Sequence, residues 1–321
     1  MDLIYTNAKR VDQGALTKYA LDLSFGADEN DFEVTLGSDE VTLESNSIVY
    51  IEGTEYGGML VGLKTGTNSN TITYVGRTWH GILNTKVIQP DAGEDYLIVS
   101  GDANEVLATL IARLGLSGLF VAEEELSGVN IPGHQFQRYC KAYDGIRMML
   151  SAHGAKLHIE WENRSVKLSA VPVVDYTDDP VDGDVATLNV ERYDKKVNHL
   201  ICLGKGELAD REVLHLYVDQ FGRIGTVQYY TGLDEVMDVY DYSNAESSDE
   251  LRTGGIERLT ELMDVDKAEI SIPEGSVSYD IGDIVGASEI KSGVRVTTTV
   301  SQKIVKINNG VVSTDYKTGS D

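Results

Sequence analysis

Alternation of apolar and polar side chains marks the first 76 residues as a series of short β-strands. Between residues 19 and 25 every second position is apolar or aromatic, which is the period of a strand with one buried face. Alternation or a short apolar run recurs at 32–36, 48–51, 59–63 and 71–75. Turn signals separate these runs, a pattern typical of β-barrels and β-sandwiches.

A helical period replaces this alternation further along the chain. A short apolar face at 79–83 predicts the first helix. Asp102 and Glu105 form a capping box before an apolar stripe, and Gly115 is expected to end that second helix. A third amphipathic helix is predicted over 142–153.

A β-hairpin is predicted directly after the third helix. Apolar positions alternate over 157–170 on both sides of a turn at Asn163-Arg164. Residues 93–175 are therefore expected to form a small α/β unit inserted after an all-β start. The acidic stretch 175–184 has no apolar period and predicts a linker.

The remainder of the chain returns to β patterning, interrupted by one helix. A capping box that starts at Ser247 predicts this helix near 247–264. Asn309-Gly310 separates two apolar runs near the C-terminus and predicts a hairpin. There is also faint self-similarity: the segment 56–62 resembles 279–286, and each precedes a polar turn and a long strand. Two related β-domains or chance would each explain this similarity.

Composition adds a strong acidic bias. The 321 residues include 27 Lys and Arg against 52 Asp and Glu, a formal net charge of −25. Such a surface repels nucleic-acid phosphates and anionic membranes, so stable nucleic-acid binding is not expected. Membrane insertion and a secretion signal are not expected either, because no run of 18 apolar residues and no basic-then-apolar N-terminus is found. Cys140 and Cys202 are expected to be buried thiols.

The stretch GKGELA at 204–209 matches G-x-G-x-x-A, a variant of the dinucleotide-binding fingerprint. That fingerprint needs a helix directly after the glycines, because the helix N-terminus holds the pyrophosphate. Residues 213–218 alternate as a strand instead, and no Ser or Thr follows the lysine as a Walker motif requires. We therefore expect a strand-to-strand connection and no cofactor, with Asp210 and Arg211 fixing the turn.

The histidines and carboxylates form no recognisable catalytic or metal-binding motif. The six histidines lack the H-E-x-x-H spacing and have no cysteine pair nearby, so zinc is not expected. Carboxylates are too abundant for a glycosidase pair to be singled out, and neither the calcium-loop spacing nor G-x-S-x-G occurs. No catalytic, cofactor-binding or metal-binding residue is assigned, and the chain is not expected to be an enzyme.

Six stretches, taken in order, resemble a bacteriophage tail family. They are YGGMLVGL from residue 56, ITYVGRTWHGILNTKVIQP from 72, YDKKVNHLICLGKGELADREVLHLYVDQFGRIG from 193, AESSDELRTGGIERLTEL from 245, SYDIGDIVGA from 278 and VSQKIVKINNGVVSTDYKTGS from 300. The chain resembles the Gp37-like siphophage and prophage tail proteins, relatives of the central baseplate hub protein of contractile phage tails.

This resemblance implies a mainly β protein with an α+β insertion: two similar β-barrel domains plus a small α/β domain. The first barrel would span 1–92 and be completed by about 172–190, the inserted domain would span 93–175, and the second barrel 190–321. Three such chains would form a pseudo-sixfold homotrimer that mates with the hexameric tail tube. The implied partners are the distal tail protein, the tape measure protein and a tip or spike protein.

The resemblance also gives the acidic surface a role, because an acidic tube lumen would repel DNA and let it pass. The chain would be assembled in the bacterial cytoplasm and carried in the virion tail. Two other functions stay open on the sequence alone. One is a carbohydrate-active enzyme of the tail tip, and the other is a receptor-binding adhesin.

Overall fold

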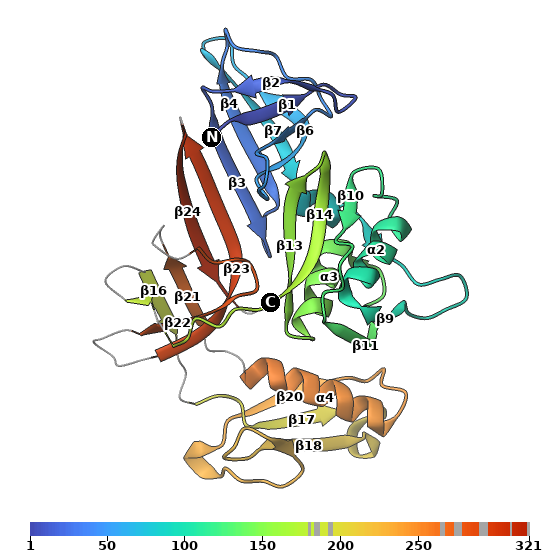
Figure 1. Cartoon of the computed structure of the whole chain (residues 1–321). Helices are drawn as coiled ribbons and strands as arrows, with labels where there is room; N and C mark the ends of the chain where they lie inside the picture. The colour runs from blue at the N-terminus through green and yellow to red at the C-terminus, as the bar shows by residue number, and fades with distance from the viewer. Residues whose placement is uncertain are drawn as a thin grey trace. The chain divides into compact units, whose positions relative to one another are not determined.

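The computed structural model describes residues 1–178, 181–182, 187–191, 195–263, 267–272, 278–288, 295–308 and 310–319 (Figure 1). These residues are mainly β, with four α-helices among them. Within the same ranges, no helix has both the length and the apolar character that crossing a membrane requires. The mainly β class predicted from the sequence is confirmed.

Residues 1–78, all of which are described, contain seven strands. These are β1 (Leu3–Thr6), β2 (Asp12–Leu16), β3 (Ala20–Gly26), β4 (Asp31–Gly37), β5 (Ile48–Tyr50), β6 (Gly57–Lys64) and β7 (Thr71–Thr78). The five runs predicted from alternation are β3 to β7. Alternate side chains of β3 and β4 are buried, including Leu21, Leu23, Phe32 and Val34. Their burial explains the period of two in the sequence.

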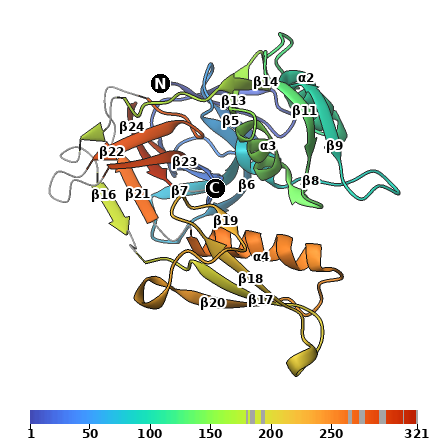
Figure 2. The same cartoon turned by 90° about the horizontal axis from the view of Figure 1, so that it is seen from below.

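Strands from the second half of the chain extend this sheet. They are β15 (Val181–Asp182), β16 (Thr187–Glu191), β21 (Lys267–Ile272), β22 (Ile284–Ser288), β23 (Arg295–Asn308) and β24 (Val311–Thr318). β23 pairs with β3 in antiparallel register, from Gln302 opposite Gly26 to Asn308 opposite Ala20. β22, β23, β24 and β21 then lie side by side (Figure 2).

The described strands follow the order β16-β21-β24-β23-β3-β4-β7-β6-β5-β1-β2, with β22 beside β23 and β15 beside β22. The order ends at β16 and β2, so the described pairings do not close either β region into a barrel. The predicted hairpin at Asn309-Gly310 joins β23 to β24, although Asn309 itself lies outside the described residues.

The resemblance implies that residues of about 172–190 complete the first β region; their described part pairs with strands from the end of the chain. The backbone of Ile284 bonds to Val174 and Tyr176, at 3.0 and 2.8 Å. β15 pairs in parallel with β22, and β16 lies beside β21. The chain leaving the inserted region therefore finds its backbone partners in β21 and β22. Of the predicted linker, 179–180 and 183–184 lie outside the described residues.

The inserted α/β region contains three helices and short strands. They are α1 (Trp79–Asn84), β8 (Val87–Ile88), β9 (Ile98–Asp102), α2 (Ala103–Arg113), β10 (Phe120–Ala122), β11 (Asn130–Gln135), β12 (Cys140–Lys141), α3 (Ala142–Ser151), β13 (Ala155–Glu162) and β14 (Ser165–Pro172). Asp102 caps α2 by accepting a bond from Asn104 N at 2.9 Å. The predicted hairpin is β13–β14, with Asn163 and Arg164 both at positive φ in its turn. The three predicted helices and this hairpin are confirmed.

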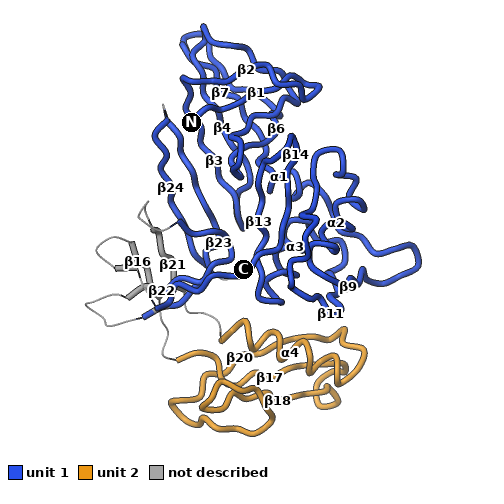
Figure 3. The backbone as a smooth tube through the Cα atoms, viewed as in Figure 1, with its two compact units in different colours: residues 1–188, 269–321 blue, residues 189–268 orange. Residues whose placement is uncertain are grey.

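The chain forms two compact units, residues 1–188 with 269–321 and residues 189–268 (Figure 3). The boundary between residues 188 and 189 lies next to the expected one at 190, whereas the expected boundaries at 92 and 175 fall inside the first unit. The first unit holds together because Trp161 of the inserted region stacks on Tyr50 of β5, with ring centroids 4.4 Å apart. The pairing of β3 with β23 then ties the C-terminal strands to the same unit.

The second unit is a small sheet covered on one face by a helix. Its elements are β17 (His199–Leu203), η1 (Leu208–Asp210), β18 (Val213–Val218), β19 (Ile224–Gly225), η2 (Gly232–Asp234), β20 (Met237–Asp241) and α4 (Ser248–Met263). The strand order is β19-β18-β17-β20. The helix predicted near 247–264 is confirmed as α4. The resemblance places this helix as an insertion in a second barrel at 190–321, and in the structure α4 covers the sheet of its own unit.

The glycines in the middle of α4 have a packing reason. A Cβ on Gly255 would lie 2.5 Å from Cys202 Sγ and 2.9 Å from Leu216 Cδ1. Gly255 therefore lets α4 approach β17 and β18 closely. Leu200, Cys202 and Leu216 of the sheet and Leu251 and Leu259 of the helix form the core of this unit.

Candidate functional site

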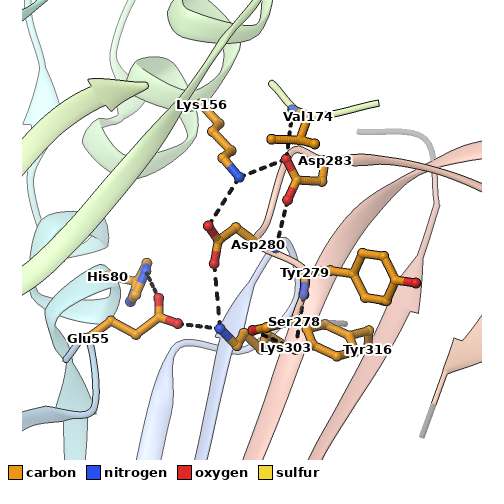
Figure 4. Close-up of polar contacts among 10 residues, drawn as sticks. All are labelled: Glu55, His80, Lys156, Val174, Ser278, Tyr279, Asp280, Asp283, Lys303 and Tyr316. Carbon is orange, nitrogen blue, oxygen red and sulfur yellow. Dashed lines mark hydrogen bonds and ion pairs between the residues drawn. The ribbon is translucent and has the colours of Figure 1, made fainter. Parts of the chain in front are cut away.

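A network of ion pairs with a buried centre and two partly exposed carboxylates lies where three parts of the first unit meet. Glu55 precedes β6 in the N-terminal β region, and Lys156 lies in β13 of the inserted region (Figure 4). Asp280 and Asp283 precede β22, and Lys303 lies in β23. We call these five residues the charge network.

Lys303 is the first of its two cations. Its side chain is 4% exposed, and its Nζ lies 2.6 Å from Glu55 Oε1 and 3.6 Å from Asp280 Oδ1. Burial alone would lower the pKa of Lys303, but Glu55, Tyr56 and Asp280 together raise that pKa above its usual range. The ammonium is therefore charged near neutral pH.

Lys156 is the second cation. Its Nζ lies 2.7 Å from Asp283 Oδ1 and 3.1 Å from Asp280 Oδ2. Asp283 is 1% exposed and also accepts backbone bonds from Val174 N at 3.0 Å and Asp280 N at 2.9 Å. Burial would raise the pKa of Asp280, but Lys303 and Lys156 hold that pKa below its usual value. Asp280 thus bridges the two lysines as a carboxylate.

Aromatic rings surround Lys303. Its Nζ lies 5.8 to 6.0 Å from the ring centroids of Phe25, Tyr56 and Tyr316, within reach of cation–π attraction. Tyr316 also accepts a bond from Tyr279 N at 3.2 Å. This shell excludes water around the ammonium and fixes the turn that carries Asp280.

His80 lies at the edge of the network. Its ring stacks on Phe25 with centroids 4.6 Å apart, and its Nε2 lies 3.8 Å from Glu55 Oε2. Burial and then the positive charges of Lys303 and Arg147 lower the pKa of His80 to about 3. The imidazole is therefore neutral near pH 7.

The chemistry of this network is structural. Each carboxylate lies against a lysine and both lysines are held by carboxylates, so every charge of the network faces an opposite charge from another chain segment. Buried ion pairs of this kind stabilise the folded state only while all partners are present. Removing one partner leaves a buried charge without an opposite charge beside it, which destabilises the fold. The network therefore fixes how the N-terminal, inserted and C-terminal parts of the first unit fit together.

The glycine-rich stretch at 204–209 joins two strands, as the sequence predicts. β17 and β18 are antiparallel with Leu203 opposite Val213, and only the short η1 lies between them. Gly206 adopts φ +102°, and a Cβ there would lie 2.5 Å from Asp210 O. The turn therefore needs glycine for its own geometry, and no α-helix follows that would hold a pyrophosphate.

The expected pairing of Asp210 with Arg211 is wrong. Arg211 pairs with Asp241 of β20 and donates from Nε to Gly204 O at 3.1 Å. The guanidinium lies at the end of β17, where it donates hydrogen bonds to the carbonyls of residues 203 and 204. Arg211 thus fixes the turn through the backbone and β20.

The remaining polar residues of the sequence analysis are scattered. In the described ranges, no group of three or more His, Cys, Asp or Glu side chains is arranged to hold a metal ion. Cys202 is buried, and burial raises its pKa to about 11. Cys140, expected to be buried, is only partly so. His199 and His215 form a hydrogen-bonded pair in the second unit.

No sequence motif predicts the charge network, but the position of one lysine in the strand pattern indicates part of it. Lys303 shares the inward face of β23 with Val305 and Ile307, and all three side chains are buried. A lysine at a core-facing strand position needs a buried partner. The sequence alone does not indicate that the partners come from residues 55 and 280.

Comparison with solved structures identifies the fold. The chain is similar along its whole length to a prophage tail protein, gp18, from Listeria monocytogenes, with a TM-score of 0.55 and 13% identity over 100% of this chain and 95% of that one. It is also similar to a tail protein from Neisseria meningitidis (TM-score 0.53, 12% identity, 100% and 96% covered) and to the 43 kDa tail protein of prophage MuSo2 from Shewanella oneidensis (TM-score 0.55, 10% identity, 99% and 98% covered).

These similarities show that the chain has the fold of phage tail proteins. At such low identity they concern the fold alone. No protein-family model and no curated protein sequence matches the chain.

Proposed function

We propose that the chain is a structural protein of a phage or prophage tail and forms the hub that joins the tail tube to the tip. The observation that carries this proposal is the match of the complete chain to nearly complete tail proteins. Because both chains are covered almost fully, the likeness includes the β regions, the inserted α/β region and the second unit together. The segments that resemble the Gp37-like tail proteins support the same role.

A structural role also fits the chemistry of the described residues. The charge network uses its carboxylates and lysines to hold chain segments together. The glycine-rich turn serves a strand connection. We therefore propose that the chain acts by assembly and not by catalysis.

The proposed hub is a homotrimer with two similar β domains in each chain. The repeat noted in the sequence supports this symmetry, because each copy opens a β-hairpin. Tyr56 precedes the hairpin β6–β7, and Tyr279 precedes β22–β23. Both repeated segments also contact Lys303: the first through the ring of Tyr56, the second through the carboxylate of Asp280. Three chains with two such domains would present six related surfaces to a hexameric tube.

The proposed partners are the distal tail protein, the tape measure protein and a tip or spike protein. The net charge of −25 supports a position around passing DNA, because an acidic lumen does not retain a polyanion. Assembly in the bacterial cytoplasm follows from the same role.

Deletion of the gene from its phage or prophage tests the tail role. We expect particles whose tails are absent or end without a tip, because no hub joins tube and tip. Plasmid expression of the parent chain should restore normal tails and infectivity. Normal tails with intact tips in the deletion strain would contradict the proposal.

A further inference from the structure

Two histidines and a glutamate form a hydrogen-bonded chain in the second unit. His199 Nδ1 lies 2.6 Å from Glu235 Oε1, and His199 Nε2 lies 2.8 Å from His215 Nδ1. The side chain of His199 is 6% exposed, and its ring lies 4.3 Å from that of Tyr217 between centroids. Glu235 also accepts a bond from Gln228 Nε2 at 2.8 Å.

The geometry of this hydrogen-bonded triad limits the number of protons that its three side chains can hold. With Glu235 ionised, His199 Nδ1–H donates to it, and His199 Nε2 then accepts from His215 Nδ1–H. His215 is an exposed residue, and one added proton on its Nε2 leaves both bonds intact. A second added proton must go to His199 Nε2, where it would face the Nδ1–H of His215 across 2.8 Å. Two charged rings therefore cannot keep this bond.

Few other charges lie against this triad. On β18 the neighbour is Tyr217, and on β20 the residue opposite His199 is Met237. Lys195 and Asp234 pair with each other, with Nζ and Oδ1 3.3 Å apart. β19 contributes Gly225 opposite Tyr217, and α4 packs against the other face of the sheet. Glu235 is therefore the charged group that decides how protons are held in the triad.

The triad holds one end of an exposed segment, residues 226–236. Val227 and Leu233 in this segment are 81% and 91% exposed. Other bonds also hold this end. Asn198 Nδ2 donates to Asp234 O, and Lys195 Nζ donates to Leu233 O. Val236 N donates to Asn198 Oδ1 at 3.0 Å, and Val236 O accepts from the backbone N–H groups of residues 198 and 199. Losing the bond between His199 and Glu235 would therefore remove the side-chain anchor at residue 235, while Val236 keeps its bonds to residues 198 and 199.

We propose that Glu235, His199 and His215 form an acid-sensitive latch that holds segment 226–236 against the second unit. Near neutral pH the triad is complete and the segment is fixed. When both imidazoles are charged, the rings separate, His199 leaves Glu235, and the segment loosens. The inference is independent of the tail role, because it concerns bonds within one unit.

Hydrogen exchange followed by mass spectrometry tests the latch on the full chain. Exchange is measured at about pH 7.5 and at about pH 5, with labelling times corrected for the intrinsic effect of pH. We expect protection of 226–236 to fall by about tenfold or more at the lower pH, while β13 and β14 of the first unit keep theirs.

Three variants separate the latch from general acid sensitivity. His215→Gln removes the second charge but keeps an amide beside His199, so it should retain protection at both pH values. His199→Gln should lose protection at both. His158→Gln, a partly exposed histidine of the first unit, should behave as the parent. An unchanged segment in the parent at pH 5, or the same loss in His215→Gln, would overturn the proposal.

Discussion

At the scale of single residues, two lysines of β23 illustrate how position decides the worth of an ion pair. The side chain of Lys303 is 4% exposed and bonded to Glu55, whereas that of Lys306 is 57% exposed and lies 3.7 Å from Asp22. Water and salt screen the second pair, so it contributes little. Lys303 and Glu55 lie where water cannot solvate the charge that would remain if either residue were replaced.

We therefore predict that Lys303→Met destabilises the protein by about 3–5 kcal/mol, because Glu55 and Asp280 lose their shared cation. The matched variant Lys306→Met should change the unfolding free energy by about 0–1 kcal/mol. Urea unfolding followed by the fluorescence of Trp79 and Trp161, which are both in the first unit, measures the two effects. Equal and small effects would show that the charge network does not hold this unit together.

His80 predicts a pH dependence of stability. Its pKa of about 3 in the folded protein lies below the ordinary value of 6.5, so below pH 6.5 the unfolded chain takes up a proton that the folded chain refuses. The contribution to stability is complete above pH 6.5 and is lost as the pH falls toward 3, by up to about 1.4 kcal/mol per pH unit.

Replacing His80 by Phe should flatten this dependence, because the stack on Phe25 is kept and the titrating group is removed. Measured from pH 7 to pH 4.5, the unfolding free energy of the parent should fall relative to that of His80→Phe as the pH drops below 6.5. His158→Gln serves as the control. A constant difference across this range would mean that the folded and unfolded chains take up the proton on His80 equally, and would contradict the lowered pKa.

At the scale of elements, the turn before β18 shows a glycine that serves geometry and not ligand binding. A Cβ on Gly206 would meet Asp210 O at 2.5 Å, and its φ of +102° is one that other residues avoid. Gly206→Ala should therefore destabilise the second unit by about 1–3 kcal/mol. Gly225→Ala is the matched control, because a Cβ there meets nothing within 4 Å. Unfolding of this unit can be followed by hydrogen exchange of β17 and β18. Equal protection in both variants would refute the geometric role.

The same turn predicts that nucleotides do not bind. Calorimetric titration of the full chain with ATP, NAD and FAD should give no heat beyond dilution. The physical reason is that η1 and then a strand follow the glycines, so no helix N-terminus is available for a pyrophosphate. A dissociation constant in the micromolar range for any of the three would refute this expectation.

Local elements were predictable from the sequence, and long-range pairings were not. The strand β3, the capped helix α2 and the turn at Asn163-Arg164 each depend on residues within a few positions of one another. The pairing of β3 with β23 joins residues more than 270 positions apart, and either strand would suit many partners. The charge network depends on that pairing, so its lysines were visible in the sequence but its partners were not.

At the scale of the whole molecule, the net charge of −25 sets the conditions for assembly. Three such chains repel one another, and salt shortens that repulsion to about 8–10 Å near physiological ionic strength. The trimeric fraction of the isolated protein should therefore increase with salt. Light scattering after size exclusion, across a salt series at fixed protein concentration, gives the mass. A trimeric fraction that falls as salt increases would mean that attraction between opposite charges drives assembly.

The central claim is that the chain forms a hub in a tail, and electron cryo-microscopy of purified tails tests it most directly. The chain is tagged at one terminus, and tails are purified from the tagged phage or prophage and averaged about the tail axis. We predict three copies in a ring where the tube ends, with two related β regions of each copy facing the six tube subunits. Tails that lack the chain, or that carry it only on side fibres away from the axis, would contradict the claim.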